Sequence, residues 1–146
     1  MHDLNNIEDP TLNENWITYA LSHSNSVPKL LSELEKETHQ KVLQPRMLSS
    51  PLQGRLLSLF SHIIQPKKIL EIGTFTGYGS LCLAEGLKKE GELHTIDCNE
   101  ELIVIQQKYF SKSKFFKQIT PHLGEALDIL PKIEGPFDLV FIDADK

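Results

Sequence analysis

The sequence has few of the features that mark secreted, membrane-spanning or nucleic-acid-binding proteins. Its 146 residues include only two cysteines, Cys82 and Cys98, which are too few for a disulfide framework and lack the spacing of a metal site. No segment approaches the roughly 18 consecutive apolar residues of a membrane span, and the first residues lack the basic start and apolar run of a secretory signal. A formal net charge of −5 disfavours a non-specific nucleic-acid binder. We therefore expect a cytoplasmic protein that binds neither membrane nor nucleic acid.

The composition is that of a soluble globular domain. Hydrophobic residues make up 40% of the chain and charged residues 24%, which is enough apolar material to fill a core and argues against disorder. The carboxyl end is unusual, because residues 137–142 form the most apolar expected strand and the sequence ends four residues later. Since chain termini are usually exposed and polar, we expect this chain to be the front part of a longer protein.

Hydrophobic periodicity divides the chain into two parts. Residues 13–24, 28–43 and 52–65 carry apolar side chains at helical spacing. From residue 67 the pattern changes, with strands expected at 69–72, 93–97, 116–120 and 137–142 and helices at 77–89, 100–112 and 124–130. Alternating strands and helices form βαβ units with parallel strands and right-handed crossovers. The predicted fold is α/β and doubly wound with a mostly parallel sheet, in which helices and a linker over residues 1–50 precede a cofactor-binding domain over residues 51–146.

A glycine-rich turn follows the first expected strand, in the segment EIGTFTGYGS from Glu71 to Ser80. Ligands of parallel sheets bind beyond the carboxyl ends of the strands, and glycines there let the backbone approach them. The dinucleotide fingerprint G-x-G-x-x-G fails, because Phe75 occupies the second glycine position. Glu71 would repel a pyrophosphate and attract a cation, which favours S-adenosylmethionine over NAD. An NAD-linked oxidoreductase is the alternative function, and a loop cap or a lysine partner is the alternative role of Glu71.

A second acidic residue, Asp97, ends the second expected strand. A carboxylate roughly 20 residues beyond a glycine turn accepts hydrogen bonds from ribose hydroxyls. This placement suits S-adenosylmethionine and NAD equally, and a simple strand-end turn residue is the alternative.

Two segments resemble signatures of the cation-dependent O-methyltransferases of the caffeoyl-CoA and catechol type. They are LEIGTFTGY at residues 70–78 and FIDADK at residues 141–146. Between them, residues 95–97 and 122–127 match in order and spacing, and the likeness extends over about residues 42–146. The resemblance implies a Rossmann-like methyltransferase fold, and methyl transfer from S-adenosylmethionine to a hydroxyl of a small, catechol-like aromatic substrate. It also implies a divalent cation such as Mg²⁺, Mn²⁺ or Ca²⁺, and we expect a homodimer.

The resemblance also implies roles for individual residues. Glu71 would bind the cofactor's amino group, Asp97 its ribose and Ala126 its adenine. The full set of cofactor-binding residues that it implies is Met47, Ser49, Glu71, Gly73, Gly77, Gly79, Ser80, Asp97, Ala126 and Asp143. Asp143 would also bind the metal, and Asp143 and Lys146 would be catalytic, the lysine as general base.

This sequence departs from the family pattern in two ways. Gly79 stands where the family usually has a serine that holds the cofactor's carboxylate, and the adjacent Ser80 is the expected substitute. The family's remaining metal ligands, an Asp–Asn pair on the next strand, would lie beyond Lys146. A fragment that binds the cofactor without catalysis is therefore a further alternative.

Overall fold

The amino-terminal part is helical. The computed structural model describes the backbone of residues 10–144 and the side chains of residues 15–144. The helices are α1 (Pro10–Ser22), α2 (Lys29–Lys41) and α3 (Pro51–Ile64), and the short 3₁₀ turn η1 (Pro45–Met47) precedes α3. Helix α3 begins at Pro51 because the Ser50 hydroxyl accepts a hydrogen bond of 3.2 Å from the backbone N–H of Gln53 and proline is preset for the first helical position.

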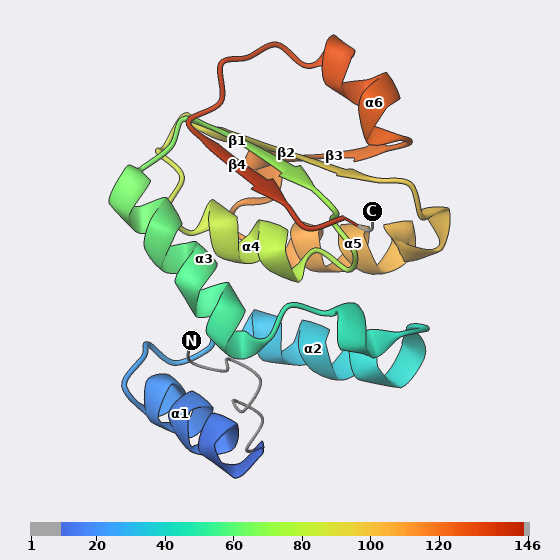
Figure 1. Ribbon diagram of the computed structural model, residues 1–146. Coiled ribbons are helices and arrows are strands. Elements are labelled where there is room, and N and C mark those ends of the chain that lie inside the picture. Colours follow the sequence, from blue (N-terminus) through green and yellow to red (C-terminus); the bar gives the residue numbers. More distant parts are fainter. Residues whose placement is uncertain (1–9, 145–146) are drawn as a thin grey trace, which may run out of the picture.

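The rest of the chain forms a four-stranded parallel sheet with helices on both faces. The strand order is β3-β2-β1-β4 (Figure 1). The strands are β1 (Lys68–Ile72), β2 (Glu92–Asp97), β3 (Ile119–Leu123) and β4 (Leu139–Ile142). Helices α4 (Tyr78–Ala84) and α5 (Ile103–Lys112) lie on one face of the sheet, and α6 (Ala126–Ile129) lies on the other. The 3₁₀ turns η2 (Glu100–Leu102), η3 (Phe116–Gln118) and η4 (Leu130–Lys132) complete the connections. The predicted doubly wound α/β fold is confirmed, and the carboxyl ends of the strands meet at one edge.

The helical part shares the hydrophobic core of the sheet. Leu34 of α2 is fully buried with Ile69 of β1 and Leu93 of β2. The Thr38 hydroxyl of α2 donates a buried hydrogen bond of 3.1 Å to the Thr76 hydroxyl in the glycine-rich turn. A domain boundary at residue 50 remains a prediction, and α2 packs directly on the part of the chain that carries the candidate site.

Two expected elements have different bounds in the structure. The strand expected at residues 116–120 is Ile119–Leu123, and Phe116–Gln118 forms η3 instead. The helix expected at residues 77–89 ends at Ala84. Soon after it the chain packs on α3 at Gly86, where a Cβ would lie 2.2 Å from the backbone of Ser61. Within residues 10–144, no helix has the length and apolar character needed to cross a membrane.

Candidate functional site

The glycine-rich turn between β1 and α4 is held in place by the end of β2. The N–H of Gly73, at φ +103°, donates to the carbonyl of Ile96 at 2.9 Å. Phe75 has a left-handed φ of +48°, a conformation that favours glycine. Its N–H donates to Asp97 Oδ2 at 2.7 Å, and its carbonyl accepts from Gln106 Nε2 at 2.7 Å. Both backbone groups of Phe75 are therefore committed to the protein.

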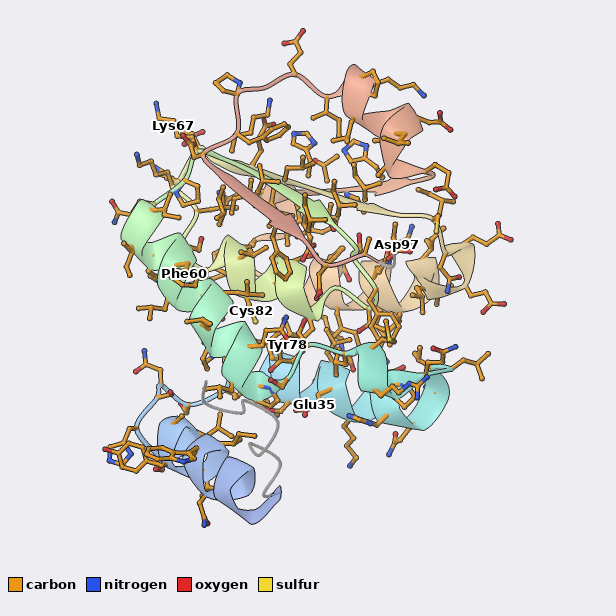
Figure 2. The ribbon with its side chains drawn as sticks, viewed as in Figure 1. Glu35, Phe60, Lys67, Tyr78, Cys82 and Asp97 are labelled. Carbon is orange, nitrogen blue, oxygen red and sulfur yellow. The ribbon has the colours of Figure 1, made fainter. Side chains whose placement is uncertain are left out.

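Asp97 lies at the carboxyl end of β2, beside this turn (Figure 2). Its Oδ1 accepts from the N–H of Asn99 at 2.9 Å, while Oδ2 binds Phe75. Each carboxylate oxygen can accept more than one hydrogen bond, and the side chain is half-buried. It borders a pocket of about 170 Å³ that Pro121, His122 and Leu123 also line. Asp97 therefore fixes the turn and keeps acceptor capacity for a ligand.

Glu71 is buried at the carboxyl end of β1, with 1% of its surface exposed. Its Oε2 accepts from the Thr95 hydroxyl at 2.5 Å and from the Ser80 hydroxyl. Thr95 lies directly opposite Glu71 in the β1–β2 register, and its hydroxyl also lies 2.6 Å from that of Thr74. Burial raises the pKa of Glu71 from 4.5 to about 7, although both hydroxyl donors act to lower it, and the charges of Asp143 and Asp97 raise it further. A buried carboxyl of this kind gains most from a cationic ligand.

Gly79 and Ser80 have different positions around this carboxyl group. A Cβ on Gly79 would lie 2.6 Å from Glu71 Oε1, so the carboxylate occupies the space beside the glycine. Ser80 is fully buried, and its hydroxyl donates to Oε2. The structure thus places the Ser80 hydroxyl against Glu71 Oε2. Direct contact between Ser80 and a cofactor remains a prediction.

For the other predicted site residues the structure gives local conformation and exposure. Gly77, at φ +92°, immediately precedes α4, and a Cβ there would lie 2.5 Å from the Phe110 ring. Met47 is exposed, and Ser49 and Ala126 are half-buried. These residues keep their predicted roles as expectations.

Asp143 follows β4 and is exposed. Its N–H donates to the Ile72 carbonyl at 2.8 Å, which places it beside the glycine-rich turn. No group of three His, Cys, Asp or Glu side chains that could hold a metal ion occurs within the part of the chain that the structure describes. One carboxylate does not make a metal site, so the described residues do not fit a divalent ion by themselves. Lys146, the predicted general base, lies outside the described residues.

Thr95 and Gln106 are site residues that reasoning from the sequence missed. Thr95 adjoins Asp97 in the strand, and only the β1–β2 register shows that it faces Glu71. The available signal was the pairing of two short strands, which would have placed a hydroxyl beside a buried carboxyl group.

The fold and site define a Rossmann-like α/β protein with two strand-end carboxylates at one edge of its sheet. A family model described as O-methyltransferase matches residues 21–146. The chain is 39% identical over 106 residues to a catechol O-methyltransferase of Niastella koreensis, covering 70% of this chain and 48% of that protein. The chain therefore belongs to the O-methyltransferase family, and the resemblance seen in its motifs is confirmed.

Solved structures agree with this assignment. The methyltransferase PaMTH1 of Podospora anserina, bound to S-adenosylhomocysteine, superposes with a TM-score of 0.88 at 28% identity, over 99% of this chain and 62% of that one. The O-methyltransferase TomG of Streptomyces achromogenes, in complex with S-adenosylmethionine, gives 0.83 at 32% identity, over 94% and 63%. This chain spans about half the length of the curated relatives that it matches.

Proposed function

We propose that this chain carries the S-adenosylmethionine-binding part of an O-methyltransferase that methylates a hydroxyl group of a small, catechol-like aromatic substrate. The observation that carries the proposal is the buried carboxyl group of Glu71 beside the glycine-rich turn. In the proposal it binds the cofactor's ammonium group, and Asp97 accepts hydrogen bonds from the ribose hydroxyls. The cofactor supplies a methyl group on a positively charged sulfur, and the chain orients it for in-line attack by the substrate oxygen.

The turn favours this cofactor over NAD. A pyrophosphate at a Rossmann turn needs free backbone N–H groups and close approach. The N–H of Phe75 is already used by Asp97, and the Phe75 side chain stands where a dinucleotide site has glycine. When it is ionised, Glu71 places a negative charge beside the turn, which opposes phosphates. The solved relatives with S-adenosylmethionine and S-adenosylhomocysteine support the same choice.

Cofactor affinity should depend on pH through Glu71. Its pKa in the free protein is about 7, and a cationic ligand requires the ionised carboxylate. Affinity therefore rises as the pH rises through 7, whereas the stability of the free protein falls between about pH 4.5 and pH 7, because the folded state there holds a proton that the unfolded state releases. Calorimetric titration with S-adenosylhomocysteine should show about tenfold weaker binding at pH 6 than at pH 8.

Glu71→Gln is the matched variant, since it keeps the side-chain shape and removes the charge. It should weaken binding at pH 8 by roughly 1–3 kcal/mol and remove the pH dependence. Titration with NAD is the control. A chain that binds NAD and ignores S-adenosylhomocysteine would refute the proposed function.

Asp97→Asn should weaken S-adenosylhomocysteine binding by roughly 1–2 kcal/mol. The amide has only one acceptor oxygen, so it cannot accept from Phe75 and Asn99 as the carboxylate does. The loss comes from the ribose contact and from a looser turn. Glu125 is an exposed acidic residue between β3 and α6. Glu125→Gln is the control and should leave the affinity unchanged. Equal affinities for Asp97→Asn and the parent chain would show that Asp97 does not bind the ribose.

Catalysis and metal dependence are separate questions from cofactor binding. Asp143 is the residue that would contribute to a divalent site, as the resemblance implies, and the proposal derives no step through a metal. Incubation with S-adenosylmethionine, Mg²⁺ and catechol tests the reaction by mass spectrometry. If S-adenosylhomocysteine binds and no methylated product forms, this chain is a cofactor-binding fragment.

The proposal includes assembly as a homodimer. Helix α3 supports it, because one face carries apolar side chains that are 48% to 69% exposed, namely Leu56, Leu59, Phe60 and Ile63. Exposed apolar side chains grouped on one helix are typical of a surface that another protein covers.

A further inference from the structure

The two oxygens of Glu71 have different surroundings. Oε2 accepts hydrogen bonds from Ser80 and Thr95. Oε1 has no hydrogen-bond partner among the residues that the structure describes, and it is not among their buried unpaired atoms. Oε1 lies next to Gly79, and a Cβ on that residue would be only 2.6 Å from it. Oε1 therefore leaves no room for a side chain at position 79. One oxygen is thus held by the protein, and the other is left for a ligand.

We propose that Ser80 and Thr95 are positioning residues that hold Glu71 Oε2, so that Oε1 is presented to the cofactor's ammonium group beside the side-chain-free Gly79. The inference rests on the proposed function. It gives Ser80 a role through Glu71 instead of direct contact with the cofactor, and it adds Thr95, for which the family resemblance implies no role.

The surroundings of the two hydroxyls favour positioning over simple packing. Ser80 and Thr95 are both fully buried, and a buried hydroxyl without a partner is costly. Thr95 is linked in turn to Thr74 in the turn itself, at 2.6 Å between the hydroxyls. The carboxylate is therefore tied both to β2 and to the loop that a cofactor would contact. A carboxylate fixed in this way loses little side-chain freedom when a cation binds, which preserves affinity.

Gly79 contributes by having no side chain. An alanine there would push against Oε1, and the carboxylate cannot swing away without breaking its bonds to Ser80 and Thr95. Where the family usually has a serine, this chain has a glycine followed by a serine. The hydroxyl of that serine, Ser80, donates to Oε2 and so supports the carboxylate.

The test is a set of S-adenosylhomocysteine titrations by calorimetry at several pH values. Thr95→Val removes the hydroxyl and keeps the shape, and it should weaken binding about tenfold at pH 7. Thr95→Ser keeps the hydroxyl and should bind within about twofold of the parent chain. Ser80→Ala should resemble Thr95→Val. Gly79→Ala, which acts from the Oε1 side and leaves both donors in place, should also weaken binding about tenfold.

Two further readouts separate positioning from a purely structural role. The hydroxyls lower the pKa of Glu71, so Thr95→Val and Ser80→Ala should move the pH midpoint of binding upward. In the Glu71→Gln background, Thr95→Val should change the affinity less than twofold, because the carboxylate through which it acts is gone.

The outcomes distinguish this inference from the proposed function. If the parent chain does not bind S-adenosylhomocysteine, both are overturned. If it binds, and folded Ser80→Ala, Thr95→Val and Gly79→Ala match it in affinity and pH midpoint, only the positioning role is overturned. An equal loss from Thr95→Val with and without Glu71 would also overturn it.

Discussion

Glu85→Ala should destabilise the protein by about 3–5 kcal/mol, one of the two largest effects that we expect. Glu85 accepts two hydrogen bonds from the Arg55 guanidinium, at 2.9 and 3.0 Å, and a third of 2.5 Å from the Ser58 hydroxyl. The Arg55 and Glu85 side chains are only 10% and 19% exposed. Removal of the carboxylate leaves a largely buried guanidinium without its counter-charge, between α3 and α4.

Urea unfolding followed by circular dichroism measures this loss. Glu92→Ala is the matched control, because Lys68 and Glu92 also form a pair at 2.9 Å, but Glu92 is 48% exposed. Exposed pairs contribute about 0–1 kcal/mol. The double variant Arg55→Met/Glu85→Leu should be more stable than Glu85→Ala, since neither charge remains buried. If Glu85→Ala and Glu92→Ala lose equal stability, the buried Arg55–Glu85 pair contributes no more to the free energy of unfolding than the exposed pair does.

The ion pair accompanies a close contact between α3 and α4. Helix α3 approaches α4 closely at Gly54, where a Cβ would lie 2.6 Å from the Tyr78 ring. Tyr78 and Cys82 of α4 face α3 at this contact (Figure 2). Tyr78 directly follows Gly77, the last residue of the glycine-rich turn. The packing of α3 therefore helps to set the position of the turn relative to the sheet.

The sequence predicted most of this fold because its strands are short, apolar and bounded by turn residues. The strand expected at residues 69–72 and the one expected at 93–97 each differ from the structure by one residue at their start. The strand expected at residues 116–120 lies at Ile119–Leu123 instead, since Phe116 is typical of strands and Pro121 is typical of a strand end. Strand β3 is at the edge of the sheet, where a proline is tolerated because one side of the strand needs no pairing.

The site could be predicted only where its residues end a strand. Glu71 and Asp97 each stand beside a recognisable turn, so their carboxylates could be assigned to the binding edge. The partners of Glu71 depend on register and burial. Thr95 faces it through β1–β2 pairing, and Ser80 reaches it from the first turn of α4. Such contacts between distant residues leave no local pattern in a single sequence.

Gly73→Ala is the other change with a large expected effect. Gly73 has φ +103°, which residues with a side chain rarely adopt. A Cβ there would lie 2.6 Å from the Asp143 carbonyl oxygen and 2.9 Å from the Ala144 nitrogen. These are backbone atoms of the segment that follows β4, fixed by the 2.8 Å bond from the Asp143 N–H to Ile72. We expect a loss of about 3 kcal/mol or more, since backbone strain and overpacking each cost about 1–3 kcal/mol.

Gly124→Ala separates strain from crowding in this prediction. Gly124 also has a positive φ, +143°, but the nearest atoms to a Cβ belong to the Ile129 side chain, at 3.4 Å or more. It should cost about 1–2 kcal/mol, from strain alone. In titrations at a temperature where both variants are folded, Gly73→Ala should bind S-adenosylhomocysteine at least about tenfold more weakly than the parent chain. Separation of β1 from Asp143 would displace the turn whose Phe75 is held by Asp97. Equal stability losses at the two glycines would show that the contact between the turn and Asp143 does not shape the site.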